Sequence, residues 1–269
     1  MGNAIKMLVH VHAFYAEQVA EMLSRLSAVS SECRMDVHVT SPVEVADEIK
    51  PLVTAGFPSA KFTEVPNLGY DIAPFIEVLR KAGPSNYDLV MKLHTKRRSL
   101  SAPLTRLNGR FLSDDLWCDT LVHSLIGSMG IFKRNLAIFA SDGRIGMAGS
   151  RYCVVKSDFG EDAVNATLLK CGLPHAEDFR FVAGSMFMAR ASLLEPLLAG
   201  DLGDFVAPVE NDRRFTLAHI LERTFGAMIS AQDMMVFGLQ EPPYIQRFMK
   251  IFFIRAWRFA AKLLRGVRA

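Results

Sequence analysis

The sequence predicts an α/β fold in which helices cover both faces of a mostly parallel sheet. In the N-terminal part of the chain, short apolar runs typical of buried strands alternate with longer segments whose apolar residues recur at helical spacing. Gly, Pro and Asn residues separate these segments. Strands that are joined through helices usually run parallel, so this repeated strand–helix order indicates a parallel sheet.

Composition agrees with a globular domain. Of the 269 residues, 50% are hydrophobic and 22% are charged, which excludes disordered and collagen-like proteins. The four cysteines form no CxxC pair, so neither a zinc knuckle nor a dense disulfide framework is expected. The N-terminal segment is too short and too polar for a signal peptide. These features predict a cytoplasmic protein.

Four strands and three helices are predicted in the first part of the chain. The strands are Lys6–His12, Met35–Thr40, Lys61–Val65 and Tyr87–His94. The helices are Tyr15–Leu26, Val45–Ala55 and Ala73–Lys81. A turn that contains Asn67, Gly69 and Asp71 precedes the third helix, and a basic cluster from Lys96 to Arg98 follows the fourth strand.

The second part of the chain is expected to complete the same domain. A helix is predicted over Asp114–Gly130, short extended pieces over Leu136–Ala140 and Ile145–Met147, a strand over Phe181–Ala189, and helices over Ala191–Leu198 and Thr216–Phe225. No low-complexity linker or internal repeat interrupts this pattern. Residues 1–241 are therefore predicted to form one domain.

Residues 242–269 differ from the rest of the chain in charge. The net charge is +3, but no acidic residue follows Glu241, while seven Lys and Arg residues do. Aromatic and aliphatic residues interleave with them at helical intervals, which predicts a basic amphipathic helix on an anionic membrane surface. The same pattern also suits a helix docked on the domain or on a second subunit. The apolar run Ile251–Ile254 is far too short to span a bilayer, and nucleic acid is not expected as a partner because the rest of the chain lacks a basic patch.

Polar residues gather where the predicted strands end. Ligands of open parallel sheets bind beyond the carboxyl ends of the strands. The residues at the carboxyl ends of the predicted strands are His12 with Tyr15, Ser41, the turn from Asn67 to Asp71, and the segment from His94 to Arg98. His10 and His12 share a strand face, a spacing that suits two metal ligands, but no third ligand has a matching spacing. His10 is therefore expected to be packed or hydrogen-bonded.

Six short blocks in this order resemble the rhamnan synthesis protein F family. They are HAFY at residues 12–15, NLGYDIAPF at 67–75, YD at 87–88 leading to KLHTK at 92–96, LIGS at 125–128, AGSMF at 183–187, and LAH with LER at 217–223. The resemblance covers about residues 5 to 230. It implies a GT-A-like glycosyltransferase of polysaccharide assembly that uses a nucleotide-sugar donor and a polysaccharide or lipid-linked glycan acceptor. A rhamnose or other deoxyhexose donor follows from the family name alone, and the acceptor implies a place at the inner face of the cell membrane.

The resemblance also implies where the donor binds. The residues at the strand ends that match the family blocks or extend them are His12, Tyr15, Asn67, Gly69, Asp71, His94, Lys96 and Arg97. GT-A enzymes usually hold a metal ion on an Asp-x-Asp after the fourth strand, where this sequence has His94-Thr95-Lys96. Lys96 and Arg97 are therefore expected to neutralise the diphosphate without a required divalent metal. A solvated basic loop is the alternative there, and a helix cap is the alternative for Asp71.

An inverting transfer needs a carboxylate that removes the proton of the acceptor hydroxyl. The candidates are Glu210, Asp212 and Glu222. The family usually has Asp-Gly-Thr before Leu-Ala-His, whereas this sequence has Arg214-Phe215-Thr216, so no candidate occupies the family position. Gly184, Ser185 and His219 are predicted to line the acceptor or sugar pocket. His219 and Glu222 share a helix face, which is equally typical of a solvent-facing ion-pair set with Arg223.

Two other functions fit parts of the pattern. A metal-dependent hydrolase would use His10, His12 and His94, and a degenerate transferase fold would serve as a carbohydrate-binding or assembly subunit. Serine hydrolysis has little support, because the AGSMF block around Ser185 lacks the GxSxG pattern of a nucleophile elbow.

Overall fold

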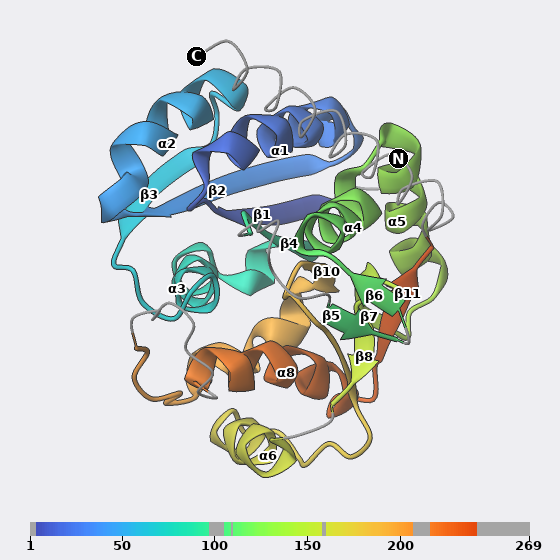
Figure 1. Ribbon diagram of the computed structural model, residues 1–269. Coiled ribbons are helices and arrows are strands. Elements are labelled where there is room, and N and C mark those ends of the chain that lie inside the picture. The colour runs from blue at the N-terminus through green and yellow to red at the C-terminus, as the bar shows by residue number, and fades with distance from the viewer. Residues whose placement is uncertain (1–3, 97–104, 109, 158–159, 207–215, 241–269) are drawn as a thin grey trace.

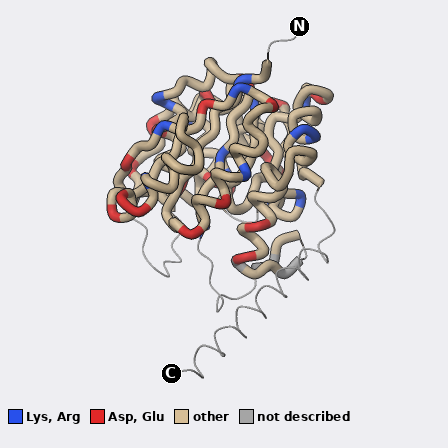
Figure 2. The backbone as a smooth tube through the Cα atoms, turned by 90° about the horizontal axis from the view of Figure 1, so that it is seen from above, with Lys and Arg blue, Asp and Glu red and all other residues tan. Residues whose placement is uncertain are grey.

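Residues 4–96, 105–108, 110–157, 160–206 and 216–240 are described by a computed structural model (Figure 1). The chain forms one mixed α/β sheet structure with helices on both sides of the sheet. Acidic and basic residues occur on several sides of the described chain (Figure 2). The predicted basic helix over residues 242–269 lies outside the described residues.

The central sheet has seven strands in the order β11-β7-β10-β4-β1-β2-β3. These strands are β1 (Lys6–His12), β2 (Arg34–Pro42), β3 (Lys61–Val65), β4 (Leu89–His94), β7 (Ile145–Ser150), β10 (Phe187–Arg190) and β11 (Met235–Leu239). Only β10 runs antiparallel to its neighbours. Two small ribbons pair β5 (Thr105–Leu107) with β6 (Arg110–Leu112) and β8 (Val154–Lys156) with β9 (Arg180–Val182). The predicted mostly parallel α/β fold is confirmed.

Helices lie on both faces of the sheet (Figure 1). On one face are α1 (Ala16–Val29), α2 (Val43–Gly56), α4 (Asp114–Ile126) and α5 (Met129–Ser141); on the other are α3 (Ile72–Ala82) and α8 (Leu217–Ser230), with α6 (Glu161–Lys170) packed outside α8. The short helix α7 (Pro196–Ala199) and the 3-10 turns Ser30–Glu32, Pro84–Asn86 and Ala191–Leu194 complete the described helical elements.

Three phenylalanines fix α3 and α8 against the sheet. Phe75 of α3, Phe187 of β10 and Phe225 of α8 are fully buried, with ring centroids 5.4 to 5.9 Å apart. Their edge-to-face and tilted contacts are typical of well-packed aromatic clusters. The cluster therefore sets where α3 and α8 meet the edge of the sheet.

The four predicted N-terminal strands and the three helices near them are confirmed, but three later predictions are wrong. Leu136–Ala140 was expected to be extended and instead lies in α5, because short apolar runs do not distinguish a strand from a buried helix. The helix expected over Asp114–Gly130 is two helices, and the Ser128 hydroxyl accepts the Ile131 N–H at 3.3 Å to cap the second. The strand expected over Phe181–Ala189 is also divided, into β9 and β10, by a turn at Gly184 and Ser185.

Gly226 lies where α8 crosses β9, and it allows the two backbones to approach closely. A Cβ atom there would stand 2.1 Å from the carbonyl oxygen of Arg180 and 2.6 Å from the Cα of Phe181. Because these are backbone atoms, Gly226→Ala is expected to lower the free energy of unfolding by about 3 kcal/mol. Gly143→Ala, where a Cβ would meet nothing within 4 Å, is the matched control in urea denaturation. Equal midpoints for the two variants would contradict this packing.

Candidate functional site

The carboxyl ends of β1, β2 and β4 lie at one edge of the sheet. His12 ends β1 and pairs in register with His94, which ends β4, and with Thr40 of β2. Because β10 runs antiparallel, the turn that precedes it, Gly184 and Ser185, comes to the same edge. This edge is where ligands of open α/β sheets bind.

Asp71 occupies the N-cap position of α3, but its side chain does not cap that helix. One carboxylate oxygen, Oδ2, accepts hydrogen bonds from the Lys92 ammonium and from the Ser185 hydroxyl at 2.6 Å. His94 Nε2 lies 3.9 Å from the same oxygen. The interpretation of Asp71 as a helix cap is therefore wrong.

The other carboxylate oxygen of Asp71, Oδ1, has no hydrogen-bond partner among the described residues. The Asp71 side chain is 15% exposed. Burial alone would raise the pKa of Asp71, yet the charges of His94 and Lys92 and the hydrogen bonds from Lys92 and Ser185 hold it well below its ordinary value. Asp71 is thus ionised at neutral pH and has one oxygen left to accept a hydrogen bond from a ligand.

Two left-handed turns carry these groups. Gly69 and Tyr70 have φ of 61° and 56°, and Gly184 and Ser185 have φ of 89° and 48°. Glycine suits this conformation, whereas Tyr and Ser adopt it at a cost in conformational free energy. The turns place Asp71 and Ser185 opposite each other.

The buried histidines of this edge are hydrogen-bonded. His10 Nε2 and His12 Nδ1 contact the Thr40 hydroxyl at 2.8 and 3.0 Å. His94 faces two carbonyl oxygens, with Nδ1 2.9 Å from that of Thr95 and Nε2 2.9 Å from that of Gly184. Burial lowers the pKa of His12 to about 4, that of His10 to well below its ordinary value, and that of His94 in the same direction.

These low pKa values make the fold sensitive to acid. The unfolded chain takes up a proton on His12 below about pH 6.5, but the folded chain does so only near pH 4, so stability falls as the pH is lowered between these values. His12 alone should contribute a loss on the order of 3 kcal/mol between pH 7 and pH 4. His12→Asn should reduce this loss in urea denaturation, while His175→Asn, at an exposed position, should not. The same acid sensitivity in both variants would contradict this account.

Hydrogen bonds at the end of β4 connect it to the start of α1. The Thr95 hydroxyl accepts the N–H groups of Phe14 and Tyr15 at 2.8 and 3.0 Å. The Gln18 amide donates to the Lys96 carbonyl at 2.7 Å and accepts the Lys96 N–H at 3.1 Å. Lys96 and Tyr15 are thereby fixed beside the site.

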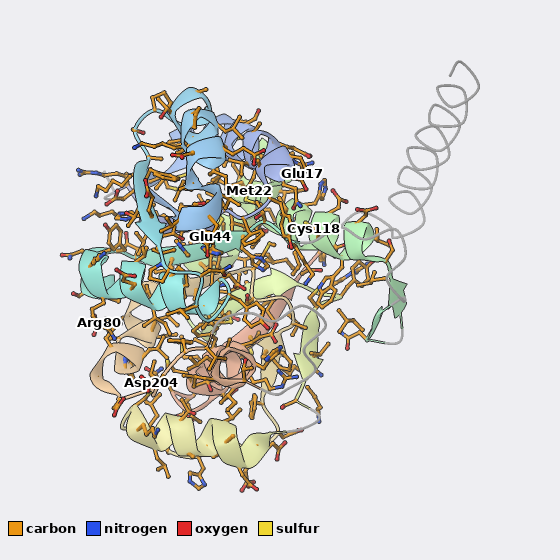
Figure 3. All side chains as sticks on the ribbon, turned by 60° about the vertical axis from the view of Figure 1, so that its left-hand side comes forward. Glu17, Met22, Glu44, Arg80, Cys118 and Asp204 are labelled. Atoms are coloured by element: carbon orange, nitrogen blue, oxygen red, sulfur yellow. The ribbon has the colours of Figure 1, made fainter. Side chains whose placement is uncertain are left out.

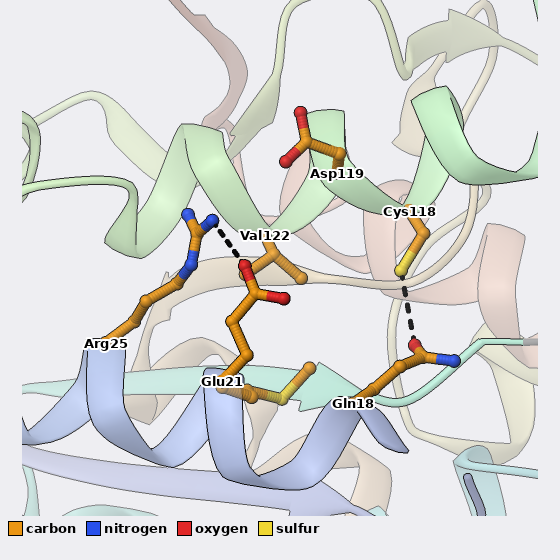
Figure 4. A pocket seen from close by; sticks show the side chains of 7 residues that line it. Gln18, Glu21, Arg25, Cys118, Asp119 and Val122 are labelled. Atoms are coloured by element: carbon orange, nitrogen blue, oxygen red, sulfur yellow. Dashed lines mark hydrogen bonds and ion pairs between the residues drawn. The ribbon is translucent and has the colours of Figure 1, made fainter. Parts of the chain in front are cut away.

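The Lys96 ammonium also lies 4.0 Å from the ring centre of Trp117 in α4. Helices α1 and α4 pack closely here, as Met22 and Cys118 show in Figure 3. A cavity of only about 20 Å³ lies between them, where Cys118 Sγ contacts Gln18 Oε1 at 3.5 Å (Figure 4). Lys96 is therefore held by both helices, its backbone by Gln18 of α1 and its ammonium by the Trp117 ring of α4.

Glu222 of α8 reaches the same edge. Its Oε1 accepts the Gly184 N–H at 2.6 Å, and its Oε2 lies 3.5 Å from the Arg223 guanidinium. The side chain is 21% exposed, and burial raises the pKa of its carboxyl. A carboxylate with a raised pKa and partial access to solvent has the properties of a general base.

The structure brings most of the predicted site residues to this edge. His12, Asp71, His94, Gly184, Ser185 and Glu222 lie within it, Tyr15 and Lys96 adjoin it, and Asn67 and Gly69 belong to the turn that carries Asp71. His219 bonds to Thr216 at the start of α8 and meets the Tyr70 ring edge-on at 5.8 Å. Arg97, Glu210 and Asp212 lie outside the described residues.

Sequence reasoning missed Lys92, Thr40 and Thr95. The available signal for Lys92 was a lysine within an otherwise apolar strand, two residues before His94 and hence on the same face. Lysine is almost never fully buried without a partner. A charged residue at such a position therefore indicates a buried counter-charge.

Within the described ranges, no group of three or more His, Cys, Asp or Glu side chains is arranged to hold a metal ion. Oδ2 of Asp71 is already bonded to Lys92 and Ser185, and the ring nitrogens of His94 face carbonyl oxygens. These residues do not fit a metal centre. None of the described helices combines the length and apolar character needed to cross a bilayer.

Three solved structures that are similar to this chain match it at low identity. The galactosyltransferase LgtC, in complex with donor and acceptor sugar analogues, matches 86% of this chain and 72% of its own at 10% identity and a TM-score of 0.34. Glucosyl-3-phosphoglycerate synthase from Mycobacterium tuberculosis, solved with Mn²⁺, UDP and glucosyl-3-phosphoglycerate, matches 90% and 74% at 14% identity and a TM-score of 0.35. Mouse xyloside xylosyltransferase 1 matches 88% and 86% at 10% identity and a TM-score of 0.35.

Two relatives named WxcX, from Xanthomonas campestris pv. campestris strain B100 and a second strain of that pathovar, are each 26% identical to this chain over 230 residues. Each match covers 82% of this chain and 31% of WxcX. The chain therefore spans about a third of the length of the curated relatives it matches.

The family model described as rhamnan synthesis protein F matches residues 2–234. This range contains every residue of the site at the carboxyl edge, from His12 to Glu222. The resemblance that the six sequence blocks indicate is thus confirmed. The chain belongs to the rhamnan synthesis protein F family.

Proposed function

We propose that this chain is a glycosyltransferase that moves a sugar from a nucleoside diphosphate to a polysaccharide or a lipid-linked glycan. One observation carries the proposal: two carboxylates at one sheet edge have pKa values displaced in opposite directions, downward for Asp71 and upward for Glu222. Such pairs divide the roles of a fixed negative charge and a proton acceptor in active sites. Membership in the family supports the same reaction class.

The roles follow from the contacts of each group. Asp71 Oδ1 accepts a hydrogen bond from a hydroxyl of the donor. Glu222 accepts the proton of the acceptor hydroxyl while the oxygen of that hydroxyl bonds to the anomeric carbon of the donor sugar. The bond from the anomeric carbon to the nucleoside diphosphate breaks, and the diphosphate leaves with its electron pair. Lys96, beside the edge, offsets the negative charge that develops on the diphosphate. His12, Tyr15, Asn67, Gly69, His94 and Arg97 belong to the donor side of this proposal, and Gly184, Ser185 and His219 to the sugar or acceptor side.

The identity of the substrates is a further part of the proposal. The family description supports rhamnose or a related deoxyhexose as the donor sugar. The basic, aromatic-rich sequence of residues 242–269 supports an anionic membrane surface as a partner, with the enzyme peripheral at the inner face of the cell membrane. Neither a divalent metal nor nucleic acid has a part in the proposed reaction.

Thermal denaturation with nucleoside diphosphates tests donor binding. We expect one of UDP, GDP or dTDP to stabilise the full chain in the presence of EDTA, by about 2.7 kcal/mol at 100 times its dissociation constant. Lys96→Met should weaken this binding about tenfold or more, because charge-assisted contacts are worth about 1.5 to 3 kcal/mol. Lys133→Met, an exposed lysine paired with Glu32 at 3.3 Å, is the control. Stabilisation by none of the nucleotides, with or without magnesium or manganese, would contradict the proposal.

A further inference from the structure

We propose that Lys92 is the positioning residue of this site, which holds the turns of Asp71 and Ser185 in one arrangement. The inference deepens the proposed function and rests on it for the roles of Asp71 and Glu222. Its structural part, the coupling of two turns by one lysine, stands on contacts within the chain. Sequence reasoning assigned Lys92 no role.

Lys92 is placed for this role by β4. Its side chain is fully buried, and its neighbours along the strand, Met91 and Leu93, are apolar and buried as well. The ammonium donates to Asp71 Oδ2, to the Ser185 carbonyl oxygen at 3.1 Å and to the Ser185 hydroxyl at 3.0 Å. An ammonium has three N–H groups, so these three acceptors use its full capacity.

Charge balance alone does not account for these contacts. Asp71 is enough to neutralise Lys92, yet two of the three hydrogen bonds go to Ser185, and one of those goes to its backbone. A bond to a carbonyl oxygen fixes the peptide plane of a turn, and Ser185 holds a left-handed φ of 48° although it is not glycine. Lys92 therefore restrains a strained backbone as well as a carboxylate.

The restraint extends to Glu222. Ser185 follows Gly184, whose N–H donates to Glu222 Oε1 at 2.6 Å and whose carbonyl oxygen faces His94 Nε2 at 2.9 Å. Lys92 thus connects the carboxylate proposed to hold the donor with the carboxylate proposed to act as base, through a single turn. Loss of this connection should change the distance between the Asp71 and Glu222 carboxylates without removing either of them.

Amide hydrogen exchange on the full chain tests the coupling without reference to activity. The turns offer protected reporters: the N–H of Gly69 bonds to Val206, that of Ile72 to Gly69, that of Gly184 to Glu222, and that of Ser185 to Val182. We expect Lys92→Met to accelerate exchange at least tenfold in both turns, relative to wild type. Exchange in α2 should be unchanged, and Lys133→Met should match wild type throughout.

A second variant separates positioning from charge balance. Lys92→Met/Asp71→Asn removes both buried charges, so it should be more stable than Lys92→Met, and it keeps the test informative if the single variant fails to fold. If Lys92 positions the turns, exchange around Gly184 and Ser185 stays fast in the double variant. If the amides of Gly184 and Ser185 exchange at the wild-type rate in the double variant, the proposal is overturned, because Lys92 then serves only as a counter-charge.

Steady-state release of nucleoside diphosphate gives the functional readout. In folded Lys92→Met we expect kcat to fall at least tenfold, and by more than the rise in KM for the donor. A change in KM alone would overturn the positioning role. If wild type releases no nucleoside diphosphate from any donor while exchange responds as expected, the proposed function fails and the coupling of the turns stands.

Discussion

Replacing Asp71 with Asn is expected to lower the free energy of unfolding by about 3 to 5 kcal/mol. The reason is Lys92, whose side chain has no exposure and whose charge Asp71 neutralises. Removing one partner of a buried ion pair leaves the other charge without compensation in a medium of low polarity. The amide of Asn retains the size of the side chain, so the loss reports on charge rather than on packing.

Urea denaturation at pH 7 measures this effect, with Asp178→Asn as the control. Asp178 pairs with Lys156 at 2.5 Å on the surface, where its side chain is 73% exposed, and exposed pairs contribute little to stability. Adding Lys92→Met to Asp71→Asn should restore much of the loss, because no buried charge remains. A stability loss in Asp71→Asn no greater than that in Asp178→Asn would contradict the buried ion pair.

Glu222→Gln is expected to reduce the turnover number by about 10² to 10⁴, which is the usual contribution of a general base. The glutamine carbonyl can still accept the Gly184 N–H, so the fold and the affinity for nucleoside diphosphate should be retained. Only the capacity to take a proton is lost.

Steady-state kinetics with a nucleotide-sugar donor, at pH 7, gives the turnover number. Glu177→Gln, at an exposed position, is the matched control and should behave as wild type. An unchanged turnover number in Glu222→Gln would remove Glu222 as the base and leave Glu210 and Asp212 as the candidates.

The strand ends could be predicted from the sequence because buried strands appear in it as short apolar runs. His12 and His94 end such runs, and parallel pairing brings both to the same edge. The Asp71 turn was also predictable, since Gly69 ahead of a helical segment indicates a left-handed turn. The N-terminal half of the site therefore followed from local pattern.

The rest of the site depends on long-range contacts. Ser185 lies 114 positions after Asp71, and its hydroxyl meets that carboxylate only because a left-handed turn divides the expected strand in two. Glu222 shares a helix face with His219, but the spacing of the two residues does not show which part of the protein that face packs against. The rotation and position of α8 depend on long-range contacts, such as the close approach of Gly226 to β9 and the packing of Phe225 on Phe75 and Phe187.

The release of nucleoside diphosphate from a panel of UDP-, GDP- and dTDP-linked sugars, deoxyhexoses included, tests whether this chain is a glycosyltransferase. We expect the full chain, in EDTA, to cleave donors of one nucleotide class slowly with water as the acceptor, and faster when a glycan acceptor is added. The released nucleotide should be the one that stabilises the protein against heat. No release from any donor, with and without glycan acceptors and divalent metals, by a protein that remains folded would contradict the account.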